Sequence, residues 1–387
     1  MKVAVIGGKL QGVEATYLAH QAGWEVVLID KDAYAPATGM CDEFYQVEIS
    51  ADPERVAEIV SKTDLIIPAI EDQAVLEMLA QIARSGQVPL AFDHSAYTLS
   101  SSKQRSDELF HGHGIPAPAY WPNCTLPVIA KPSFASGSHG VRKFYDARDL
   151  SEFLGKLNGD RGSWVIQEYL EGPSYSIEVI GAKGQVVALQ ITDLGMDRSY
   201  DCKRVSAPTE LSVALEREFR EIAVEIARLI NLNGIMDVEV INHHGVLKVL
   251  EIDARLPSQT PTAVYKSSGV NMIENLYQVF AQGTAPQISE IVPSQAVVYE
   301  HLRVGDESIE TLGEHIMANA GPLTHFRDFF GADEAITNFR TDRTAFVATL
   351  IITAPTPGEA WAKRCDVIES IRKHYNLTVY LDSTPDN

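Results

Sequence analysis

Apolar and polar positions along the first hundred residues follow two alternating periods. Four short apolar runs fit buried strands: Val3–Ile6, Glu25–Ile29, Asp64–Pro68 and Val88–Phe92. Between them apolar residues recur every three or four positions, as from Leu10 to Leu18 and from Val75 to Ala83, which is typical of one helix face. Strands that alternate with helices predict a parallel, doubly wound sheet.

The pattern changes after the segment His111–Pro118, which is rich in Gly, His and Pro. Predicted strands now follow one another directly, as in an α+β body with antiparallel pairs: Pro127–Lys131, Trp164–Glu168, Tyr175–Ile180, Val186–Ile191, Ile235–Asn242 and Val246–Arg255. A long amphipathic helix from Leu211 to Leu229 interrupts them. Further strands are expected at Ala296–Glu300, Ala345–Thr353 and Leu377–Leu381, with a helix at Ala360–His374.

The loop Gly7–Gly12 stands where a dinucleotide-binding fingerprint would lie, and Asp30 closes the next strand. The middle glycine of that fingerprint, which lets the backbone approach a pyrophosphate, is replaced by Lys9. This weakens the case for NAD but leaves a second nucleotide contact at Leu10, Gln11 and Asp30 open. Lys9 and Glu71 both follow strand ends, where ligands of open sheets bind, so they are candidates for contacting a charged small molecule. The glycines alone could equally serve a tight turn.

The strongest chemical signal is an acidic hairpin from Gly234 to Arg255. A three-residue loop, His243–Gly245, would set Asp237 opposite Glu251. One face would then carry acids and a cation: Asp237, Glu239, Glu251, Asp253 and Arg255. The other would carry Met236, Val238, Val240, Leu250, Ile252 and Ala254. Carboxylates this close repel unless a cation sits among them, so Asp237, Glu251 and Asp253 predict a Mg²⁺ site for a nucleotide. A solvated polar face is the simpler alternative.

A set of residues that could hold a nucleotide is predicted next. Each feature alone is weak evidence for nucleotide binding, but their order along the chain is informative. No P-loop is present, but Lys131 leaves a strand and precedes a glycine- and serine-rich loop containing Ser136. Lys103 comes before it, and the strand end Gln167–Gly172 comes after it and could offer backbone groups to adenine. Beyond the hairpin, the hydroxyl and amide groups of Ser258–Thr262 could hold a carboxylate beside the γ-phosphate.

Composition and charge narrow the classes of function. The 387 residues suffice for two or three domains, and 32 basic against 52 acidic side chains give a net charge of −20. Such a surface repels nucleic acid and anionic membranes, so neither is an expected partner. Four scattered cysteines, and an amino terminus that enters a strand directly, favour reduced thiols and a cytoplasmic location.

The order of these motifs over roughly Ser100 to Gly269 resembles the ATP-grasp superfamily, whose members join a carboxylate to an amine. The resemblance implies an α/β and α+β fold: a Rossmann-like pre-ATP-grasp domain over residues 1–95, a small lobe over 96–174, a large lobe with the metal site over 175–292, and an α+β region over 293–387. It implies ATP and Mg²⁺ as cofactors. Asp253 departs from the asparagine usual in the superfamily and adds a negative charge.

Carried over residue by residue, the resemblance assigns roles to the motifs. ATP would contact Lys103, Lys131, Ser136, Glu168, Tyr169 and Leu170. Asp237, Glu251 and Asp253 would hold Mg²⁺, and Arg255 would stabilise the transferring phosphoryl group and the tetrahedral intermediate.

Within the superfamily the whole chain resembles the ligases of pyrrolysine biosynthesis, which join (3R)-3-methyl-D-ornithine to the ε-amine of L-lysine. Stretches such as Gly7–Gly12, Tyr200–Cys202, Glu251–Tyr265 and Tyr299–Leu302 carry this resemblance. It places Lys9 and Glu71 beside lysine. The other candidate substrate residues are Ser176, Glu178, Ser258, Gln259, Thr260 and Glu300.

Other functions remain open at this stage. Another ATP-grasp ligase, of the D-alanine–D-alanine or purine-pathway type, would share most of these motifs. An NAD-dependent oxidoreductase would rest on the first domain, and a non-enzymatic nucleotide sensor would not need the third acid. The general base for the attacking amine, the ribose ligand and a homodimeric state are also left open.

Overall fold

The computed structural model describes residues 1–133, 140–157, 163–286 and 291–385. The chain begins with a parallel four-stranded sheet of order β3-β2-β1-β4. Its strands are β1 Lys2–Ile6, β2 Glu25–Asp30, β3 Glu43–Gln46 and β4 Leu65–Pro68. The helices of this domain are α1 Leu10–Gln21, the 3₁₀ turn η1 Pro36–Gly39, α2 Pro53–Val60 and α3 Gln73–Gly86.

The strand predicted at Val88–Phe92 was wrong. This segment makes only an isolated bridge between Ile66 and Leu90. Pro89 lacks an N–H group to donate to a longer ladder, and Asp93 caps the next helix with its side chain, so pairing stops after one step.

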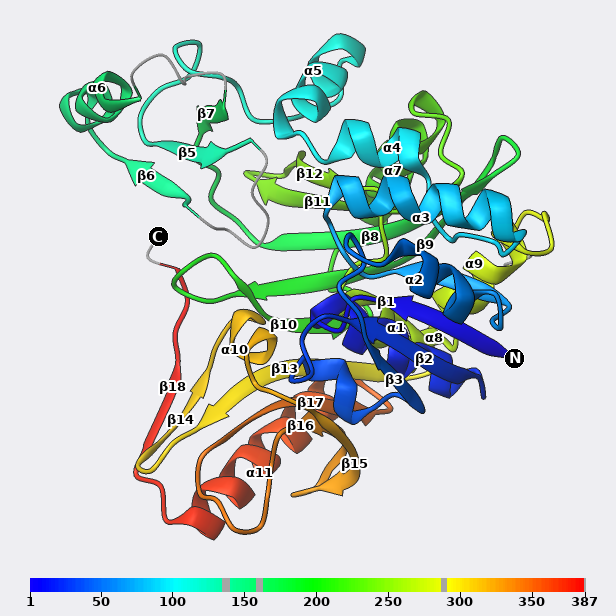
Figure 1. Cartoon of the computed structure of the whole chain (residues 1–387). Helices are drawn as coiled ribbons and strands as arrows, with labels where there is room; N and C mark the ends of the chain where they lie inside the picture. Colours follow the sequence, from blue (N-terminus) through cyan, green and yellow to red (C-terminus); the bar gives the residue numbers. More distant parts are fainter. Residues whose placement is uncertain (134–139, 158–162, 287–290, 386–387) are drawn as a thin grey trace.

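A small antiparallel sheet of order β6-β5-β7 follows, joined to the first domain by two helices. The helices are α4 His94–Ser100 and α5 Lys103–His113. The lobe consists of β5 Val128–Pro132, β6 Arg142–Phe144, α6 Ala147–Lys156 and β7 Trp164–Glu168. Figure 1 shows this lobe standing apart from the rest, above the end of the large sheet.

The remaining strands form one large sheet of order β12-β11-β8-β9-β10-β13-β17-β16-β15, with β14 paired to β13 and β18 paired to β14. Its first strands are β8 Ser174–Ala182, β9 Gln185–Met196, β10 Cys202–Ala207, β11 Gly234–His243 and β12 Val246–Asp253. The later ones are β13 Ala296–Val304, β14 Ser308–Thr311, β15 Thr324–Phe329, β16 Ala332–Thr337, β17 Phe346–Ala354 and β18 Val379–Asp382. Because β10 pairs with β13, the sheet runs through the domain boundary predicted at residues 292 and 293.

Helices cover both faces of the large sheet. They are α7 Val213–Leu229, α8 Thr260–Ser268, α9 Met272–Phe280, α10 His315–Ala318 and α11 Pro357–Tyr375. A cluster under α7 includes Phe219 and Ile177, and a separate cluster under α11 includes Ile371 and Leu350. The mixed architecture confirms the predicted fold class. Within the described part of the chain, no helix combines the length and apolar character that crossing a bilayer needs.

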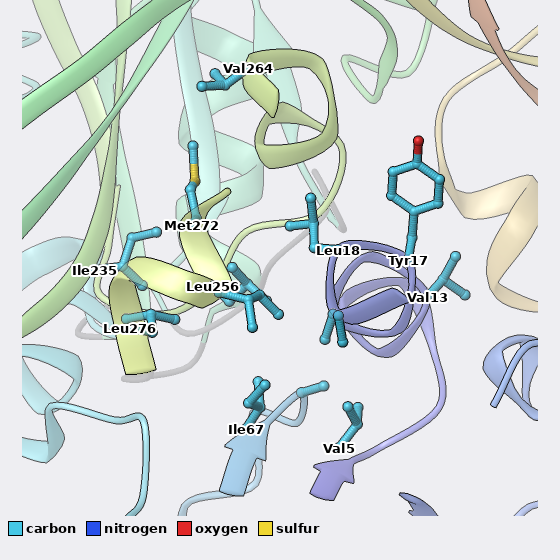
Figure 2. Close-up of a cluster of buried hydrophobic side chains, with 14 of the residues drawn as sticks. Val5, Val13, Tyr17, Leu18, Ile67, Ile235, Leu256, Val264, Met272 and Leu276 are labelled. Carbon is cyan, nitrogen blue, oxygen red and sulfur yellow. The ribbon is translucent and has the colours of Figure 1, made fainter. Parts of the chain in front are cut away.

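The amino-terminal domain shares its core with the large lobe. In Figure 2 Leu18 of α1 lies on the side of the helix that faces residues of α8, α9 and β11, and all of them belong to one buried cluster. Leu18, Met272 and Leu276 are at most 1% exposed. This continuous packing fixes the loop before α1 relative to the hairpin β11–β12.

Candidate active site

The acidic hairpin has a shorter turn than predicted. His243 pairs with Val246, so the turn contains only His244 and Gly245, whose φ angles of 53° and 88° are both positive. Two consecutive positive φ values are typical of the two-residue turns that match strand twist. The predicted three-residue loop was therefore wrong, as was the pairing of Asp237 with Glu251: Asp237 lies opposite Asp253, and Glu239 lies opposite Glu251.

A β-bulge at Leu250 reconciles this short turn with the segregated faces. The register shifts between Glu239 and Val240, which leaves Leu250 as the extra residue on β12. The bulge turns Leu250 away from the apolar face, where it was predicted, and makes it line a pocket beside Glu251. The acids still share one face, because opposite residues of paired strands point the same way.

Among the described residues, this face of the hairpin carries four carboxylates, and burial raises the pKa of three of them. Burial, and then the charge of Asp253, raise the pKa of Asp237 well above its usual value. Burial and the neighbouring Glu251 raise the pKa of Glu239 to about 7. Burial raises the pKa of Asp253 to about 6, against the lowering effect of Arg255. Carboxylates crowded in this way repel one another, and a cation among them would relieve that repulsion.

Cations approach this cluster from three directions. The ammonium of Lys103, at the start of α5, donates to Glu251 over 2.9 Å. Burial would raise the pKa of Glu251, but the charges of Lys103 and of buried Lys131 hold it below its usual value. The guanidinium of Arg255 lies 2.8 Å from Asp253. Oδ1 of Asp237 and Oδ1 of Asp253 nevertheless have no hydrogen-bond partner in the described part of the chain.

A pocket of about 480 Å³ opens between the small lobe and the large sheet. Its lining includes several predicted ATP contacts: Lys103, Lys131, Glu168, Tyr169 and Leu170. Apolar Ile129, Ile241 and Leu250 line it together with the acids Glu239 and Glu251. This volume, and a lining that combines apolar with charged groups, are typical of a site for a small organic ligand. Ser136, the remaining predicted ATP contact, lies outside the described residues.

The strand end proposed as an adenine hinge is already partly engaged. The N–H of Glu168 donates to Ala119 over 2.9 Å, and that of Tyr169 donates to Pro127 over 3.1 Å. The Glu168 carboxylate accepts from the Ala119 N–H over 3.0 Å and also from Lys248. These contacts fix the strand end. The N–H groups of Glu168 and Tyr169 are used for hydrogen bonds inside the protein, and both residues line the pocket.

A second, smaller pocket of about 150 Å³ lies on the other side of the carboxylates. It is lined by the predicted substrate residues Ser176, Ser258, Gln259 and Thr260 with Asp237, Asp253 and Arg255. Gln259 is 5% exposed and has a φ of +73°, a backbone conformation that costs energy for a residue with a side chain. Ser258 donates to Glu314 over 2.7 Å.

Glu14 of α1 holds the loop that carries Gln259. Its buried carboxylate accepts from the N–H of Thr262 over 2.5 Å, in the first turn of α8. Burial raises the pKa of Glu14 to about 7, against the lowering effect of this contact. A carboxylate at a helix N-terminus is stabilised by the free N–H groups there. The amino-terminal domain thus fixes the loop beside the acids.

Two further acids, Glu178 and Glu300, were predicted as substrate residues, and their surroundings differ. Glu178 lies opposite Asp237 on β8, is fully buried, and has its pKa raised by burial to about 7. Glu300 is fully buried as well, but its oxygens accept from Arg364 over 2.8 and 2.9 Å and from Arg204 over 2.5 Å. Arginines already neutralise Glu300, so we leave it out of the substrate site proposed below.

A third pocket, of about 620 Å³, lies over the amino-terminal loop. It brings together Lys9, Leu10, Gln11, Asp30 and Glu71, as the sequence predicted, and shares Arg255, Ser258 and Glu314 with the smaller pocket. Asp30 accepts from the N–H of Gly8 over 2.6 Å, and Glu71 accepts from Gln11 over 3.0 Å. Glu71 also lies 2.9 Å from Arg255.

The glycines of this loop have a packing role. Gly7 has a φ of +104°, and a Cβ there would lie 2.4 Å from the carbonyl oxygen of Ala69. A Cβ on Gly12 would lie 2.1 Å from the oxygen of Gly7. Close approach of the backbone therefore accounts for both glycines without a bound pyrophosphate.

Sequence reasoning missed the lining residues Lys203, Arg204 and Glu314, and also Glu14, which holds the loop at Thr262. All four come from segments that carry no recognisable motif. Only the register of β10 against β9 and β13 brings Arg204 to the pocket, and that register includes a bulge that no sequence pattern signals. The position of Leu250 could have been inferred from the turn. A two-residue turn keeps the acids on one face only if one strand carries an extra residue.

Comparison with known proteins matches two parts of the chain to described families. Residues 3–88 match the family described as PylC-like, N-terminal domain, and residues 100–259 match the ATP-grasp domain family. The 3-methyl-D-ornithine–L-lysine ligase of Methanosarcina barkeri is 34% identical over 97% of this chain and 99% of its own length. The enzyme of the same name from Methanosarcina acetivorans is 38% identical over 82% and 84%.

A solved structure extends the likeness in fold. The biotin carboxylase domain of the Hydrogenobacter thermophilus 2-oxoglutarate carboxylase superposes with a TM-score of 0.73 at 18% identity. The match covers 95% of this chain and 89% of that domain, which was crystallised as a dimer with MgADP, ADP and bicarbonate.

Proposed function

This chain belongs to the 3-methyl-D-ornithine–L-lysine ligase family of ATP-grasp enzymes, and on that premise we propose its reaction. ATP phosphorylates the carboxylate of (3R)-3-methyl-D-ornithine, and the ε-amine of L-lysine attacks the acyl phosphate. The products are ADP, phosphate and an amide, as a step of pyrrolysine biosynthesis. Both substrates are those of the 3-methyl-D-ornithine–L-lysine ligases of Methanosarcina to which the chain is similar.

The observation that carries the proposal is the cluster of buried carboxylates with unpartnered oxygens. Asp237 and Asp253 each keep one buried oxygen without a hydrogen-bond donor in the described part of the chain, beside Glu251. Unpaired buried charge is costly, so these oxygens require protons or a cation. Oxygen ligands suit Mg²⁺, which leaves room for phosphate oxygens. When bound with ATP between Asp237, Glu251 and Asp253, Mg²⁺ would neutralise charge on the phosphoryl oxygens.

The residues around the cluster divide the remaining work. Lys103 and Lys131 would bind phosphate oxygens from the pocket between the small lobe and the large sheet, with Ile129, Ile241 and Leu250 around the base. As the γ-phosphoryl group moves to the ornithine carboxylate, its bond to ADP breaks and a new O–P bond forms. Arg255 lies where that charge develops and would stabilise it by preorganised electrostatics.

The second half of the reaction needs an amine at the acyl carbon. We propose that lysine occupies the amino-terminal pocket near Lys9 and Glu71, and that the ornithine occupies the smaller pocket near Ser176, Glu178 and Ser258–Thr260. The new C–N bond displaces phosphate, and the amine nitrogen loses a proton. Because Arg255 borders both pockets, the two substrates would meet beside it.

Product analysis tests this function. The protein is incubated with ATP, Mg²⁺, L-lysine and either D-ornithine or its 3-methyl form, with each amino acid omitted in turn. ADP and a new mass equal to both amino acids less one water are expected only with both present. AMP, or a product that lacks lysine, would contradict the proposal and favour another ATP-grasp ligase.

Assembly is a separate proposal. The Hydrogenobacter domain was crystallised as a dimer, and a homodimer is the corresponding state proposed for this chain. Light scattering on the purified protein tests it: a mass near 85 kDa is expected, about twice the 42.5 kDa of one chain, and a mass near 42.5 kDa would exclude it.

A further inference from the structure

The last described residues of the chain form part of the wall of the pocket between the small lobe and the large sheet. We define the carboxyl-terminal tail as Asp382–Pro385, the last described residues. Thr384 and Pro385 line this pocket together with the hinge residue Tyr169 and with Tyr200. In Figure 1 the red segment that follows β18 lies beside the loop that joins β9 and β10. We propose that this tail belongs to the nucleotide-binding site and that Asp382 is the residue that positions it.

The tail is held by buried ionic contacts. Parallel pairing of β18 with β14 brings Asp382 opposite Thr311. From β10, the ammonium of Lys203 donates to Oδ1 of Asp382 and to the carbonyl oxygen of Ser383, both over 2.5 Å. The Lys203 side chain is only 1% exposed. A buried ammonium without its partners is strongly unfavourable, so these contacts keep the tail against β10.

A second basic residue ties Asp382 to the interior of the large sheet. Arg204 donates to Oδ2 of Asp382 over 2.7 Å and also binds Glu300. Glu300 in turn binds Arg364 of α11, which lies 3.6 Å from Asp382. This set contains the cations Lys203, Arg204 and Arg364 against the acids Glu300 and Asp382. Asp382 therefore supplies half of the negative charge that fixes these cations.

The position of the tail indicates what it contributes. Lys203 and Arg204 line the same pocket as Thr384, so the anchor and the wall are adjacent. On the hinge side Gly172 is followed by Pro173 and Ser174, which bring no charged side chain to the lining. The tail adds a hydroxyl at Thr384 and a rigid ring at Pro385. A nucleotide held by hinge and tail would lose more water than one held by the hinge alone.

The inference rests on the proposed function, because it needs ATP in this pocket. Its test compares the full chain with a chain that ends at Ser383, which keeps Asp382 and both of its basic partners. Nucleotide affinity is measured by calorimetric titration with MgATP, and turnover is measured from ADP release. We expect truncation to weaken MgATP binding and raise the KM for ATP about tenfold, with kcat within about twofold.

Two further variants distinguish loss of the tail from loss of the fold. Replacing Thr384 and Pro385 together by glycine leaves chain length and every anchoring contact in place, and should reproduce the loss. Asp382→Asn should weaken binding in the same direction by releasing the tail. Asp366→Asn, at an exposed carboxylate on α11, is the matched control and should leave affinity unchanged.

The outcomes separate the two proposals. If the full chain binds no MgATP, the proposed function and this inference fall together. If the full chain binds MgATP and both the truncated and the double-glycine chains bind it equally well, only the inference falls. Thermal melting of each variant checks that it is folded. If the truncated chain is unfolded, the affinity of the double-glycine variant decides the test.

Discussion

At the scale of single residues, Arg255 joins two pockets through its two carboxylate partners. Its guanidinium lies 2.8 Å from Asp253 and 2.9 Å from Glu71. Loss of one well-placed stabilising donor costs about 3–4 kcal/mol, or about 10²–10³ in rate. We expect Arg255→Ala to lower kcat by that factor while the circular dichroism spectrum stays unchanged.

The matched control is Arg303→Ala. Arg303 also pairs with a carboxylate, that of Glu310, but its side chain is 51% exposed and lies on β13 away from the described pockets. Its removal should leave kcat within about twofold, because exposed ion pairs contribute little. Near wild-type turnover of Arg255→Ala would show that the role given to Arg255 is wrong.

Glu178 gives a pH-dependent prediction at the same scale. Its folded-state pKa of about 7 lies above its ordinary value of 4.5, so the folded state binds more protons than the unfolded state between these values. Stability from this group is therefore full below about pH 4.5 and is lost as the pH rises toward 7. Glu178→Gln should remove this loss. The free energy of unfolding of the variant, relative to the wild type, should therefore be higher at pH 8 than at pH 5 by on the order of 2 kcal/mol.

Denaturant unfolding at both pH values measures this effect. Glu310→Gln, at a carboxylate that is paired near the surface, serves as control and should shift both values alike. An equal change in stability at pH 5 and pH 8 for Glu178→Gln would contradict a raised pKa. If Glu178 also binds an ammonium, the same variant should raise the KM for the ornithine substrate.

Residue chemistry was the part of the site most accessible from the sequence. Acids spaced two apart on a strand must share a face, so the pairing of Asp237 with Glu239 and of Glu251 with Asp253 followed from spacing. The cation that pairs with a given carboxylate could not be predicted from the sequence. Glu300 stands in a stretch that resembles the ligase family, yet its cations come from β10 and α11, far away in the sequence.

At the scale of elements, the bulge in β12 is the feature that shapes the nucleotide pocket. It turns Leu250 into the pocket next to Glu251. We expect Leu250→Ala to raise the KM for ATP about tenfold, because burying several fewer methyl and methylene groups against a base costs about 1–2 kcal/mol. Turnover at saturating ATP should change little, since the acids keep their positions.

Val246→Ala is the control on the same strand. Val246 is 46% exposed and lies beside the turn, outside the pocket lining. Steady-state kinetics at varied ATP measure both variants. An unchanged KM for Leu250→Ala would mean that the bulge serves the fold of the hairpin and not nucleotide binding.

Periodicity predicted the existence of strands better than their pairing. The long apolar runs of β8, β9, β11, β13 and β17 were all anticipated, because each is buried on at least one face. Short strands such as β10 and β16 mix polar and apolar residues. They form strands because neighbouring strands pair with them, which their own sequence does not indicate. A bulge has no composition signature, so the register of β11 with β12 could not follow from the sequence alone.

At the scale of the whole molecule, the shared core predicts how the protein unfolds. Tyr17 and Leu18 of α1 are buried with Met272 and Leu276 of α9, as in Figure 2. Neither the first domain nor the large lobe can expose this surface without losing the same hydrophobic contacts. We therefore expect both to unfold in one calorimetric transition.

Leu18→Ala provides the sharper test of this coupling. Truncating a fully buried leucine typically costs about 2–5 kcal/mol, so the single transition should move to lower temperature as a whole. Leu381→Ala, at a side chain that is 48% exposed, should move it little. Two separated transitions in the wild-type protein or in Leu18→Ala would contradict the shared core.

The order of the domains along the chain was predictable, whereas their contacts were not. Alternation of strands and helices identified the first domain, and the acidic hairpin identified the second. Nothing in the spacing indicated that Glu14 would hold the loop at Thr262, or that Glu71 would reach Arg255. Such contacts depend on how two finished surfaces fit, which no local pattern encodes.

The pockets form a continuous series, with Glu239 and Glu251 shared by the first two and Arg255, Ser258 and Glu314 shared by the last two. A compound that joins a phosphonate mimic of the activated ornithine to a lysine side chain could therefore span the junction at Arg255. Tethering would make its second half bind at a high effective concentration. Such a bisubstrate inhibitor would bind far more tightly than either half, and it would be built around the geometry of a single arginine.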